Sequence, residues 1–277
     1  MPPLRISVVT PSLNQSEFLE ENILSVLGQN DPAFEHIVID AASTDHTVDI
    51  LKRYHHLRWI SEPDSGQSAA LNKGFRMADG DVIGWLNADD CYCPGTFERV
   101  RELFRNDKTM VVYGDGREIN QHGEAIGKII PRGISAREFI CYWLWKYSYC
   151  QPSFFFRRTA LERVGYLDES LHYVMDHDVL IRLILLYPFV YVPQCFSSFR
   201  IHPESKTSKS LRFMIPSSLR ELHRVSRRYW GKTDQVPYCS AVCSFAGAIV
   251  ISFFKNIFFI RGSKLREATR RIVRSKK

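Results

Sequence analysis

The segment from Gly80 to Asp90 holds the side chains of this chain that are best suited to chemistry. Residues 82–86 form an apolar run short enough for one buried strand, and Asn87, Asp89 and Asp90 follow where that strand should end. Ligands of open α/β sheets bind outside the carboxyl ends of the strands. Adjacent carboxylates repel each other, and Mg²⁺ or Mn²⁺ relieves that repulsion while completing its coordination shell with substrate phosphates. The segment therefore predicts a metal–diphosphate site; the alternative is a solvated turn after a strand.

A second pair of carboxylates, Asp176 and Asp178, lies about 86 residues later, at the start of a helix predicted over 178–186. Side chains at positions i and i+2 do not share a helix face, so we expect only one of the pair to enter a site. A carboxylate in that place could take a proton from an attacking hydroxyl. The alternative is that both residues cap the helix N-terminus.

The order of the predicted elements indicates how these side chains are positioned. Runs of β-branched and aromatic residues predict strands, and apolar residues at helical spacing predict helices. Because strands alternate with helices, the pattern predicts an α/β fold with a parallel, doubly wound sheet. Pro11 should end the first strand, Asp45 should be a helix N-cap, and residues 117–150 are less regular. The predicted strands are 5–10, 35–40, 57–61, 82–86, 110–113, 152–156 and 189–192, and the predicted helices are 18–27, 45–54, 66–77, 96–104, 159–164 and 178–186.

The charge and the cysteine content limit the possible partners of the protein and the compartment in which it works. The whole formal net charge of +7 lies within residues 261–277, which hold eight basic residues and one acidic residue, so residues 1–260 are balanced. A balanced body excludes nucleic acid as a partner on charge grounds. The seven cysteines are an odd number without C-x-x-C spacing, which favours reduced thiols and the cytosol. The first five residues lead straight into a strand, so we expect no signal peptide.

Residues 236–277 differ in kind from the rest of the chain. Residues 238–254 contain no charged residue over 17 positions, and the basic cluster follows shortly afterwards. This pairing predicts an apolar helix, embedded in the membrane or interfacial, whose polybasic flank binds an anionic cytoplasmic leaflet. The alternative is a terminal helix buried against the domain, because a span needs about 20 apolar residues. We therefore expect a cytoplasmic protein that is peripheral or monotopic on the inner face of the cell membrane.

Five segments, in their order along the chain, resemble the inverting GT-A glycosyltransferases of family 2. They are residues 8–14 (VVTPSLN), 39–47 (IDAASTDHT), 62–74 (EPDSGQSAALNKG), 80–90 (GDVIGWLNADD) and 175–182 (MDHDVLIR). The resemblance extends over about residues 5–207. It implies a GT-A domain over residues 1–235, with a Rossmann-like nucleotide-binding half over about 1–116 and an acceptor-binding half over about 117–235. The apolar helix and basic tail, 236–277, would follow as a separate segment.

The resemblance implies a site for a nucleotide-sugar donor. The nucleoside would lie between the loop after the first strand and Asp40, with Asp64 near the base and ribose. Gly66 begins a helix whose free N–H groups could face phosphate, and Asn72 would face the same way. The implied donor-binding residues are Thr10, Pro11, Asn14, Asp40, Asp64, Gly66, Asn72, Asn87 and Ala88.

The resemblance also implies a divalent cation, Mn²⁺ or Mg²⁺. Asp89 would be the direct metal ligand, and His202 a second ligand or a phosphate contact; a structural histidine is the alternative. Asn87 stands where the family usually has Asp, and it supplies a neutral oxygen in place of a carboxylate. On this basis Asn87→Asp should be tolerated.

Asp176 matches the general base of the family, although Met175 replaces the usual preceding Glu. Asp178 would then cap the helix or pair with Arg182. The possible supporting residues are Asp90 in the metal motif, Gln151 on the acceptor side, Asp178, and Arg200 and Lys206, which could neutralise phosphate charge.

The predicted activity is metal-dependent transfer of a sugar, with inversion, from a nucleotide-diphosphate sugar to a hydroxyl of a glycan or lipid-linked glycan. A UDP-sugar is expected from the frequency of such donors in the family. One alternative is a sugar-1-phosphate nucleotidyltransferase, but residues 10–14 lack the Gly, Lys or Arg that a triphosphate-binding loop needs. The other is a non-catalytic sugar-nucleotide-binding or scaffold protein, against which the presence of Asp89, Asp176 and His202 argues.

Overall fold

A computed structural model describes residues 4–142, 148–206 and 216–231 of the chain. The predicted apolar helix and basic tail, residues 236–277, lie outside these ranges. Within them, no helix has the length and apolar character that crossing a bilayer requires.

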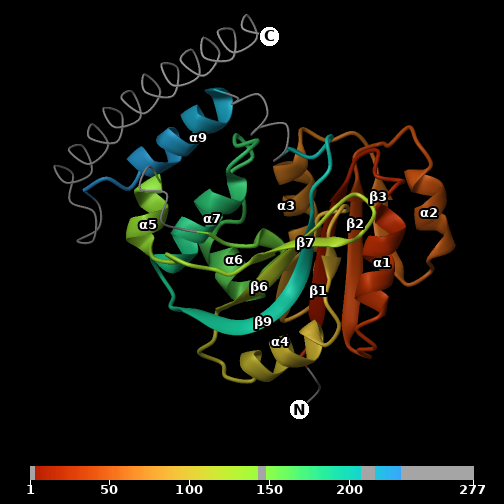
Figure 1. Cartoon of the computed structure of the whole chain (residues 1–277), viewed down its shortest axis with the longest axis horizontal. Coiled ribbons are helices and arrows are strands. Elements are labelled where there is room, and N and C mark those ends of the chain that lie inside the picture. The colour runs from red at the N-terminus through yellow and green to blue at the C-terminus, as the bar shows by residue number, and fades with distance from the viewer. Residues whose placement is uncertain (1–3, 143–147, 207–215, 232–277) are drawn as a thin grey trace, which may run out of the picture.

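The strands form one nine-stranded sheet in the order β3-β2-β1-β4-β8-β6-β9-β5, with β7 paired to β6 at the side (Figure 1). The boundary predicted between the two halves, near residue 116, falls inside β6, so both halves share this sheet. The strands are β1 (Ile6–Ser12), β2 (Phe34–Asp40), β3 (Leu57–Ser61), β4 (Val82–Trp85), β5 (Cys91–Tyr92), β6 (Val111–Ile119), β7 (Ala125–Ile129), β8 (Phe154–Arg157) and β9 (Phe189–Arg200).

Helices cover both faces of the sheet. Val9 of β1 packs in one apolar cluster with residues of α3 and α7, whereas Ile6 and Val8 pack in another with α4, as the alternation of side chains along a strand requires. Helix α9 lies next to α5, at the far end of the molecule from α2 (Figure 1). The helices are α1 (Leu19–Leu27), α2 (Thr47–Arg53), α3 (Gln67–Met77), α4 (Thr96–Phe104), α5 (Ala136–Ile140), α6 (Arg158–Val164), α7 (Met175–Ile184) and α9 (Pro216–Arg227), with a 3₁₀ turn η2 at Gln151–Ser153.

The α/β fold class is confirmed, but the prediction of a parallel sheet is wrong for its second half. Strands β3, β2, β1 and β4 are parallel, whereas β8 runs antiparallel to β4 and β6 runs antiparallel to β8. The second half is mixed, because β9 is parallel to β6. The reversal comes with the β6–β7 hairpin, which helix–strand alternation does not reveal. Its turn contains Gly123, whose positive φ of 81° favours glycine.

Several strands extend beyond the predicted ends for local reasons. β1 continues through Pro11 to Ser12, because β4 pairs with it only as far as Val9 and leaves one edge of β1 free. β9 continues past Pro193 because register shifts opposite Gly114 and Asp115 let the pairing with β6 resume. The apolar pattern did not predict this pairing, because the added parts of β6 and β9 contain polar residues.

Two helix starts also differ from the prediction. Helix α7 begins at Met175, three residues earlier than expected, so Asp176 lies in its first turn and Asp178 is no cap. Helix α2 begins at Thr47 with His46 as its N-cap, although Asp45 still accepts a hydrogen bond from the Thr47 N–H at 3.0 Å.

Candidate active site

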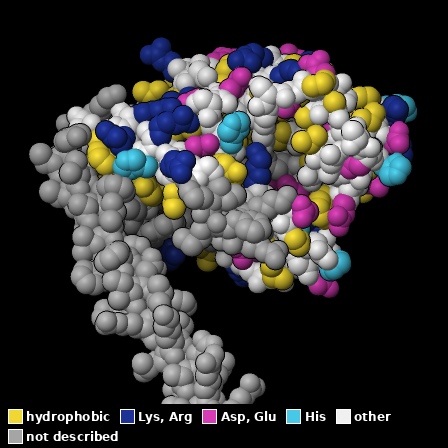
Figure 2. Space-filling model, turned by 90° about the horizontal axis from the view of Figure 1, so that it is seen from above, with side chains coloured by type: hydrophobic (Ala, Val, Ile, Leu, Met, Phe, Trp, Pro, Cys, Tyr) yellow, Lys and Arg dark blue, Asp and Glu magenta, His cyan; other side chains and the backbone are white. Residues whose placement is uncertain are grey.

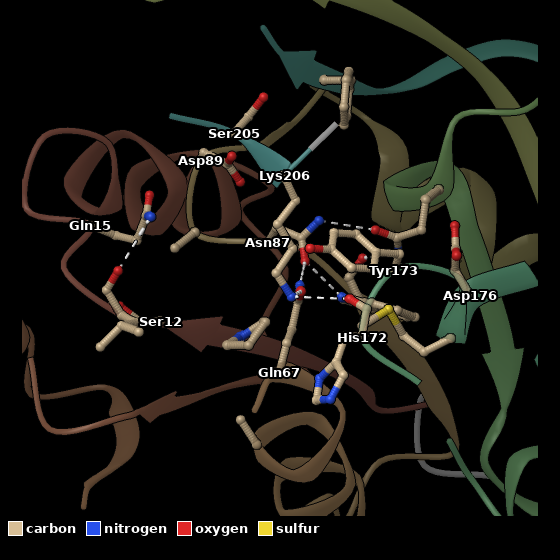
Figure 3. A pocket seen from close by; sticks show the side chains of 18 of the residues that line it. Ser12, Gln15, Gln67, Asn87, Asp89, His172, Tyr173, Asp176, Ser205 and Lys206 are labelled. Carbon is tan, nitrogen blue, oxygen red and sulfur yellow. Dashed lines mark hydrogen bonds between the residues drawn. The ribbon is translucent and has the colours of Figure 1, made fainter. Parts of the chain in front are cut away.

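A cavity of about 710 Å³ opens where the parallel half of the sheet meets the segments around α7 and after β9. It brings together residues that are far apart in the sequence, including both predicted carboxylate motifs (Figure 3). The predicted site residues that line it are Pro11, Asp64, Gly66, Asn87, Ala88, Asp89, Gln151, Asp176, His202 and Lys206. The predicted residues that do not line it are Thr10, Asn14, Asp40, Asn72, Asp90, Asp178 and Arg200.

Asp89 and His202 meet at one wall of the cavity. The Oδ2 atom of Asp89, which follows β4, lies 3.0 Å from Nε2 of His202, which follows β9. The histidine side chain is only 6% exposed and its ring packs against Phe18 with centroids 4.7 Å apart, so it is aimed at Asp89. Carboxylate oxygen and imidazole nitrogen are both ligands for Mn²⁺.

No group of three or more His, Cys, Asp or Glu side chains that could hold a metal occurs among the described residues. The protein would therefore supply two ligands, Asp89 and His202. This fits a divalent cation of the Mg²⁺ or Mn²⁺ type, which usually keeps positions for waters and substrate phosphates.

Asn87 is the centre of a hydrogen-bonded network rather than a free ligand. Its Oδ1 accepts from Trp85 Nε1 and from Gln67 Nε2, both at 2.9 Å. Its Nδ2 lies 3.3 Å from Asp90 Oδ2 and 3.2 Å from Gln151 Oε1. An amide has both the acceptor and the donors that these four neighbours need, whereas a carboxylate has acceptors alone.

Arg200 does not reach the cavity, contrary to the expectation that it neutralises phosphate. It is 1% exposed, and its Nε donates to the carbonyl oxygen of Asp89 at 2.8 Å. Its other nitrogens bond the carboxylate of Glu21 and the carbonyl oxygens of Asn120 and Gln121, each of these two at 3.2 Å. The buried guanidinium thus holds the backbone that carries the metal motif.

Asp90 is fully buried behind Asp89. Its Oδ1 accepts the backbone N–H of Arg200 at 2.9 Å. Burial, followed by the adjacent Asp89 charge, raises the pKa of Asp90 well above its ordinary value. Of the two adjacent carboxylates, Asp89 alone therefore faces the cavity.

Asp176 lies on a different side of the cavity from Asp89 (Figure 3). Its Oδ2 accepts a hydrogen bond from the Tyr149 hydroxyl at 3.1 Å. Burial raises the pKa of Asp176, while the hydrogen bonds to it oppose that rise. A carboxylate with a raised pKa and access to a cavity is suited to accept a proton.

Asp178 points away from the cavity, as its spacing from Asp176 predicts. It is 1% exposed and pairs with Arg182 at 2.8 Å and with Arg228 at 3.3 Å. The predicted pairing with Arg182 is confirmed, and the cap alternative is wrong.

The predicted nucleoside residues divide into two groups. Asp64 lines the cavity and accepts the backbone N–H of Gly66 at 2.8 Å. Asp40 is fully buried, and its carboxylate accepts hydrogen bonds from the hydroxyls of Ser43 and Ser61. It therefore holds the loop that follows β2 against the end of β3. Thr10 is also fully buried.

Asn14 joins neighbouring loops, because its side-chain oxygen accepts the Thr44 N–H at 2.9 Å. Asn72 does not reach the cavity; it bonds the backbone of Leu167 instead. Both residues thus hold backbone segments in place.

Several polar or aromatic residues that line the cavity were not predicted from the sequence, among them Gln67, Tyr149, His172 and Tyr173. Gln67 links Asn87 to Lys206, whose Nζ donates to Gln67 Oε1 at 2.7 Å (Figure 3). Tyr149, His172 and Tyr173 come from segments between predicted elements. The position of His172 and Tyr173 just before the Asp176 motif was the signal that could have revealed them.

The architecture is similar to that of solved glycosyltransferases. The structure of S. aureus TarS 1–349 in complex with UDP-GlcNAc matches 86% of this chain and 69% of that chain with a TM-score of 0.67 at 17% identity. A mannosyltransferase from Pyrobaculum calidifontis, in complex with GDP-Man and Mn²⁺, matches 89% of this chain and 75% of that chain with a TM-score of 0.60, also at 17% identity. The chain therefore has the GT-A fold.

The sequence comparisons identify the family. The family model described as Glycosyl transferase family 2 matches residues 7–165, and the chain belongs to that family. It is 27% identical to chondroitin synthase of Escherichia coli over 74% of its length and 31% identical to the putative teichuronic acid biosynthesis glycosyltransferase TuaG of Bacillus subtilis over 45%. It spans 30% of the first relative and 52% of the second.

Arg200→Ala should destabilise the fold by roughly 2–4 kcal/mol, because the carbonyl oxygens that Arg200 satisfies would stay buried without a donor. Arg200→Lys should recover little of this loss, since one ammonium cannot reach all of these oxygens. Urea unfolding measures both. Arg105→Ala, on an exposed residue, is the control and should change stability by about 0.5 kcal/mol or less. Equal stability of Arg200→Ala and wild type would contradict the bracing role.

The network around Asn87 reverses the expectation that Asn87→Asp is tolerated. A carboxylate there would face Asp90 across the 3.3 Å contact, which raises the folded-state pKa of the pair. Stability should therefore be lost as pH rises and recovered as pH falls. Urea unfolding at about pH 5 and about pH 8 measures this difference. Asn87→Ala adds no charge and should show a smaller pH effect; an Asn87→Asp protein as stable as wild type at both pH values would disprove the argument.

Proposed function

We propose that this protein transfers a sugar from a nucleotide-diphosphate sugar to a hydroxyl of a glycan or lipid-linked glycan, with inversion and with a divalent cation. The observation that carries the proposal is that Asp89 and His202 on one side and Asp176 on another line the same cavity. A UDP-sugar is the proposed donor. TarS, with the same fold, is described in complex with UDP-GlcNAc, and this supports the choice.

In the proposed reaction, residues on one side of the cavity act on the acceptor hydroxyl and residues on the other side act on the departing diphosphate. The acceptor hydroxyl attacks the anomeric carbon, Asp176 takes the hydroxyl proton, and the bond to the nucleoside diphosphate breaks. Asp89 and His202 would hold Mn²⁺ or Mg²⁺, which when bound stabilises the negative charge on the departing diphosphate. Attack from the side opposite the leaving group inverts the anomeric configuration.

Lys206 is a further candidate for the diphosphate end. Its Nζ lies 2.7 Å from Gln67 Oε1, and burial lowers its pKa while Glu221, Asp64 and Asp176 oppose that shift. A partly desolvated ammonium beside the metal motif is suited to neutralise phosphate.

The acceptor class is a proposal drawn from the relatives. Chondroitin synthase and a putative teichuronic acid enzyme are named for polysaccharides.

An anionic membrane surface is the proposed partner of residues 236–277, since their basic cluster carries the net charge of the chain. The proposed location is the cytoplasmic face of the cell membrane.

Asp176→Asn should leave donor binding intact and lower turnover roughly 10²–10⁴-fold, because the amide cannot take the proton. Nucleotide release from a panel of nucleotide sugars with Mn²⁺ measures the turnover. In wild type, the raised pKa of Asp176 should place the acid limb of the pH–rate profile above the ordinary Asp value of about 3.9. Asp178→Asn is the matched control and should act through stability. A folded Asp178→Asn protein without turnover, beside an active Asp176→Asn protein, would reverse the assignment.

Asp89→Ala should abolish transfer, and EDTA should do the same to wild type, because Asp89 and His202 are the metal ligands proposed. Calorimetry of UDP binding with and without Mn²⁺ gives a readout independent of turnover: Mn²⁺ should strengthen binding to wild type and not to Asp89→Ala. Full activity of wild type in EDTA would overturn the metal assignment.

The chain should sediment with anionic liposomes at low salt, and a variant lacking residues 236–277 should stay in the supernatant. The truncated protein should still hydrolyse the donor, since every proposed catalytic residue precedes that segment. High salt should release only part of the intact protein, because it screens the basic cluster and leaves apolar contacts in place. An intact chain that ignores liposomes at low salt would show that the membrane proposal is wrong.

A further inference from the structure

The segment from Leu167 to Tyr173, which joins α6 to α7, is held on one side by helix α3. Asn72 accepts the Leu167 N–H at 2.9 Å and donates to the Leu167 carbonyl oxygen at 3.0 Å. One turn earlier, Ser68 donates to the carbonyl oxygen of Leu171 at 2.9 Å. Because residues four apart share a helix face, one stripe of α3 holds this side of the segment.

Helix α9 holds the other side. Arg228, just beyond its end, pairs with Asp168 at 2.8 Å, and Arg224 donates to the Ser170 carbonyl oxygen at 3.1 Å. Glu221 accepts the backbone N–H groups of His172 at 3.1 Å and of Tyr173 at 2.9 Å. Glu221 and Arg224 lie three positions apart on one face of α9, and Arg228 follows four positions later, so this side of the helix and its end contact the segment.

The end of the segment that Glu221 holds is the end that reaches the cavity. His172 and Tyr173 both line the cavity (Figure 3). The His172 carbonyl oxygen lies 3.3 Å from Lys206 Nζ, and α7 with Asp176 begins two residues after Tyr173. Glu221 and Lys206 thus bond the same residue, His172, at its N–H and its carbonyl group respectively.

We propose that Glu221 is a positioning residue: by accepting the two N–H groups it fixes the cavity wall between Lys206 and Asp176 in the geometry that transfer requires. The inference rests on the proposed function and names a residue outside the family match, which ends at residue 165. A shift of about 1 Å in a positioned group can lower a rate about 10²-fold. Loss of Glu221 should therefore lower kcat more than it raises the donor KM.

The test compares Glu221→Ala, Glu221→Gln and Arg220→Ala with wild type in the full chain. A glutamine oxygen still accepts N–H groups, so Glu221→Gln should retain the positioning that Glu221→Ala loses. Arg220 is exposed on the same helix and serves as the matched control. Figure 2 shows several Lys and Arg side chains on one face of the molecule, so the control removes one exposed charge among several.

Three measurements are made on each protein. They are the melting temperature, hydrogen exchange of the backbone around residues 170–175, and release of nucleotide with Mn²⁺ from UDP-GlcNAc, UDP-glucose, UDP-glucuronate and GDP-mannose. Hydrogen exchange requires no substrate, so it tests the contact of Glu221 with the segment even if the wild type turns over none of these donors. A wild type that turns over none of them would count against the proposed function alone.

Glu221→Ala should exchange faster at residues 170–175 and lose about tenfold or more in kcat with a donor KM within about twofold of wild type. Glu221→Gln and Arg220→Ala should resemble wild type in both. Unchanged exchange in Glu221→Ala would overturn the proposal. So would a loss of activity that only follows the unfolded fraction, or a Glu221→Gln protein as impaired as Glu221→Ala.

Discussion

The geometry of the site depends on one buried side chain, the guanidinium of Arg200. Arg200 is 1% exposed, and a guanidinium removed from water must have its N–H groups bonded. Its partners are the Asp89 carbonyl oxygen, Glu21 on α1 and the turn at 120–121, while its own N–H bonds Asp90. These partners come from three separate stretches of the chain. The position of the metal motif relative to β9, and so of Asp89 relative to His202, follows from satisfying this one side chain.

The charges of the site are separated by burial and by neutral amides. Asp90 is sealed behind Asp89, and its raised pKa reduces the repulsion that two adjacent carboxylates would otherwise create. Asn87 satisfies four neighbours at once without adding a charge. Asp176 lies away from this cluster, bonded to Tyr149, so that its burial and its hydrogen bonds set its pKa. The proposed metal ligand Asp89 and the proposed base Asp176 thus line one cavity but have different electrostatic surroundings.

The two halves of the sheet contribute differently. The parallel half supplies Pro11, Asp64 and the metal motif from the ends of its strands and the loops that follow them, as expected for open α/β sheets. The second half supplies the base side, through α7 and the segment before it, and depends on α3 and α9 to hold that segment. The family match ends at residue 165, so it includes α3 but neither the segment before α7 nor α9. The side of the cavity that holds the proposed base thus depends on contacts that involve residues beyond the family match.

The sequence by itself determined the fold class, the five motifs and the entry of only one of Asp176 and Asp178 into the cavity. Strand ends and helical spacing are local properties, and they carry this information. Only the tertiary structure decided the antiparallel pairing of β8 with β4, the bracing role of Arg200 and the attachment of Asn72 to Leu167. Each of these depends on a partner more than 70 positions away along the chain. The residue type alone also does not distinguish a side chain that could bind phosphate from one that bonds a buried carbonyl oxygen. Burial and the nearest partner, which no local pattern records, distinguish the two.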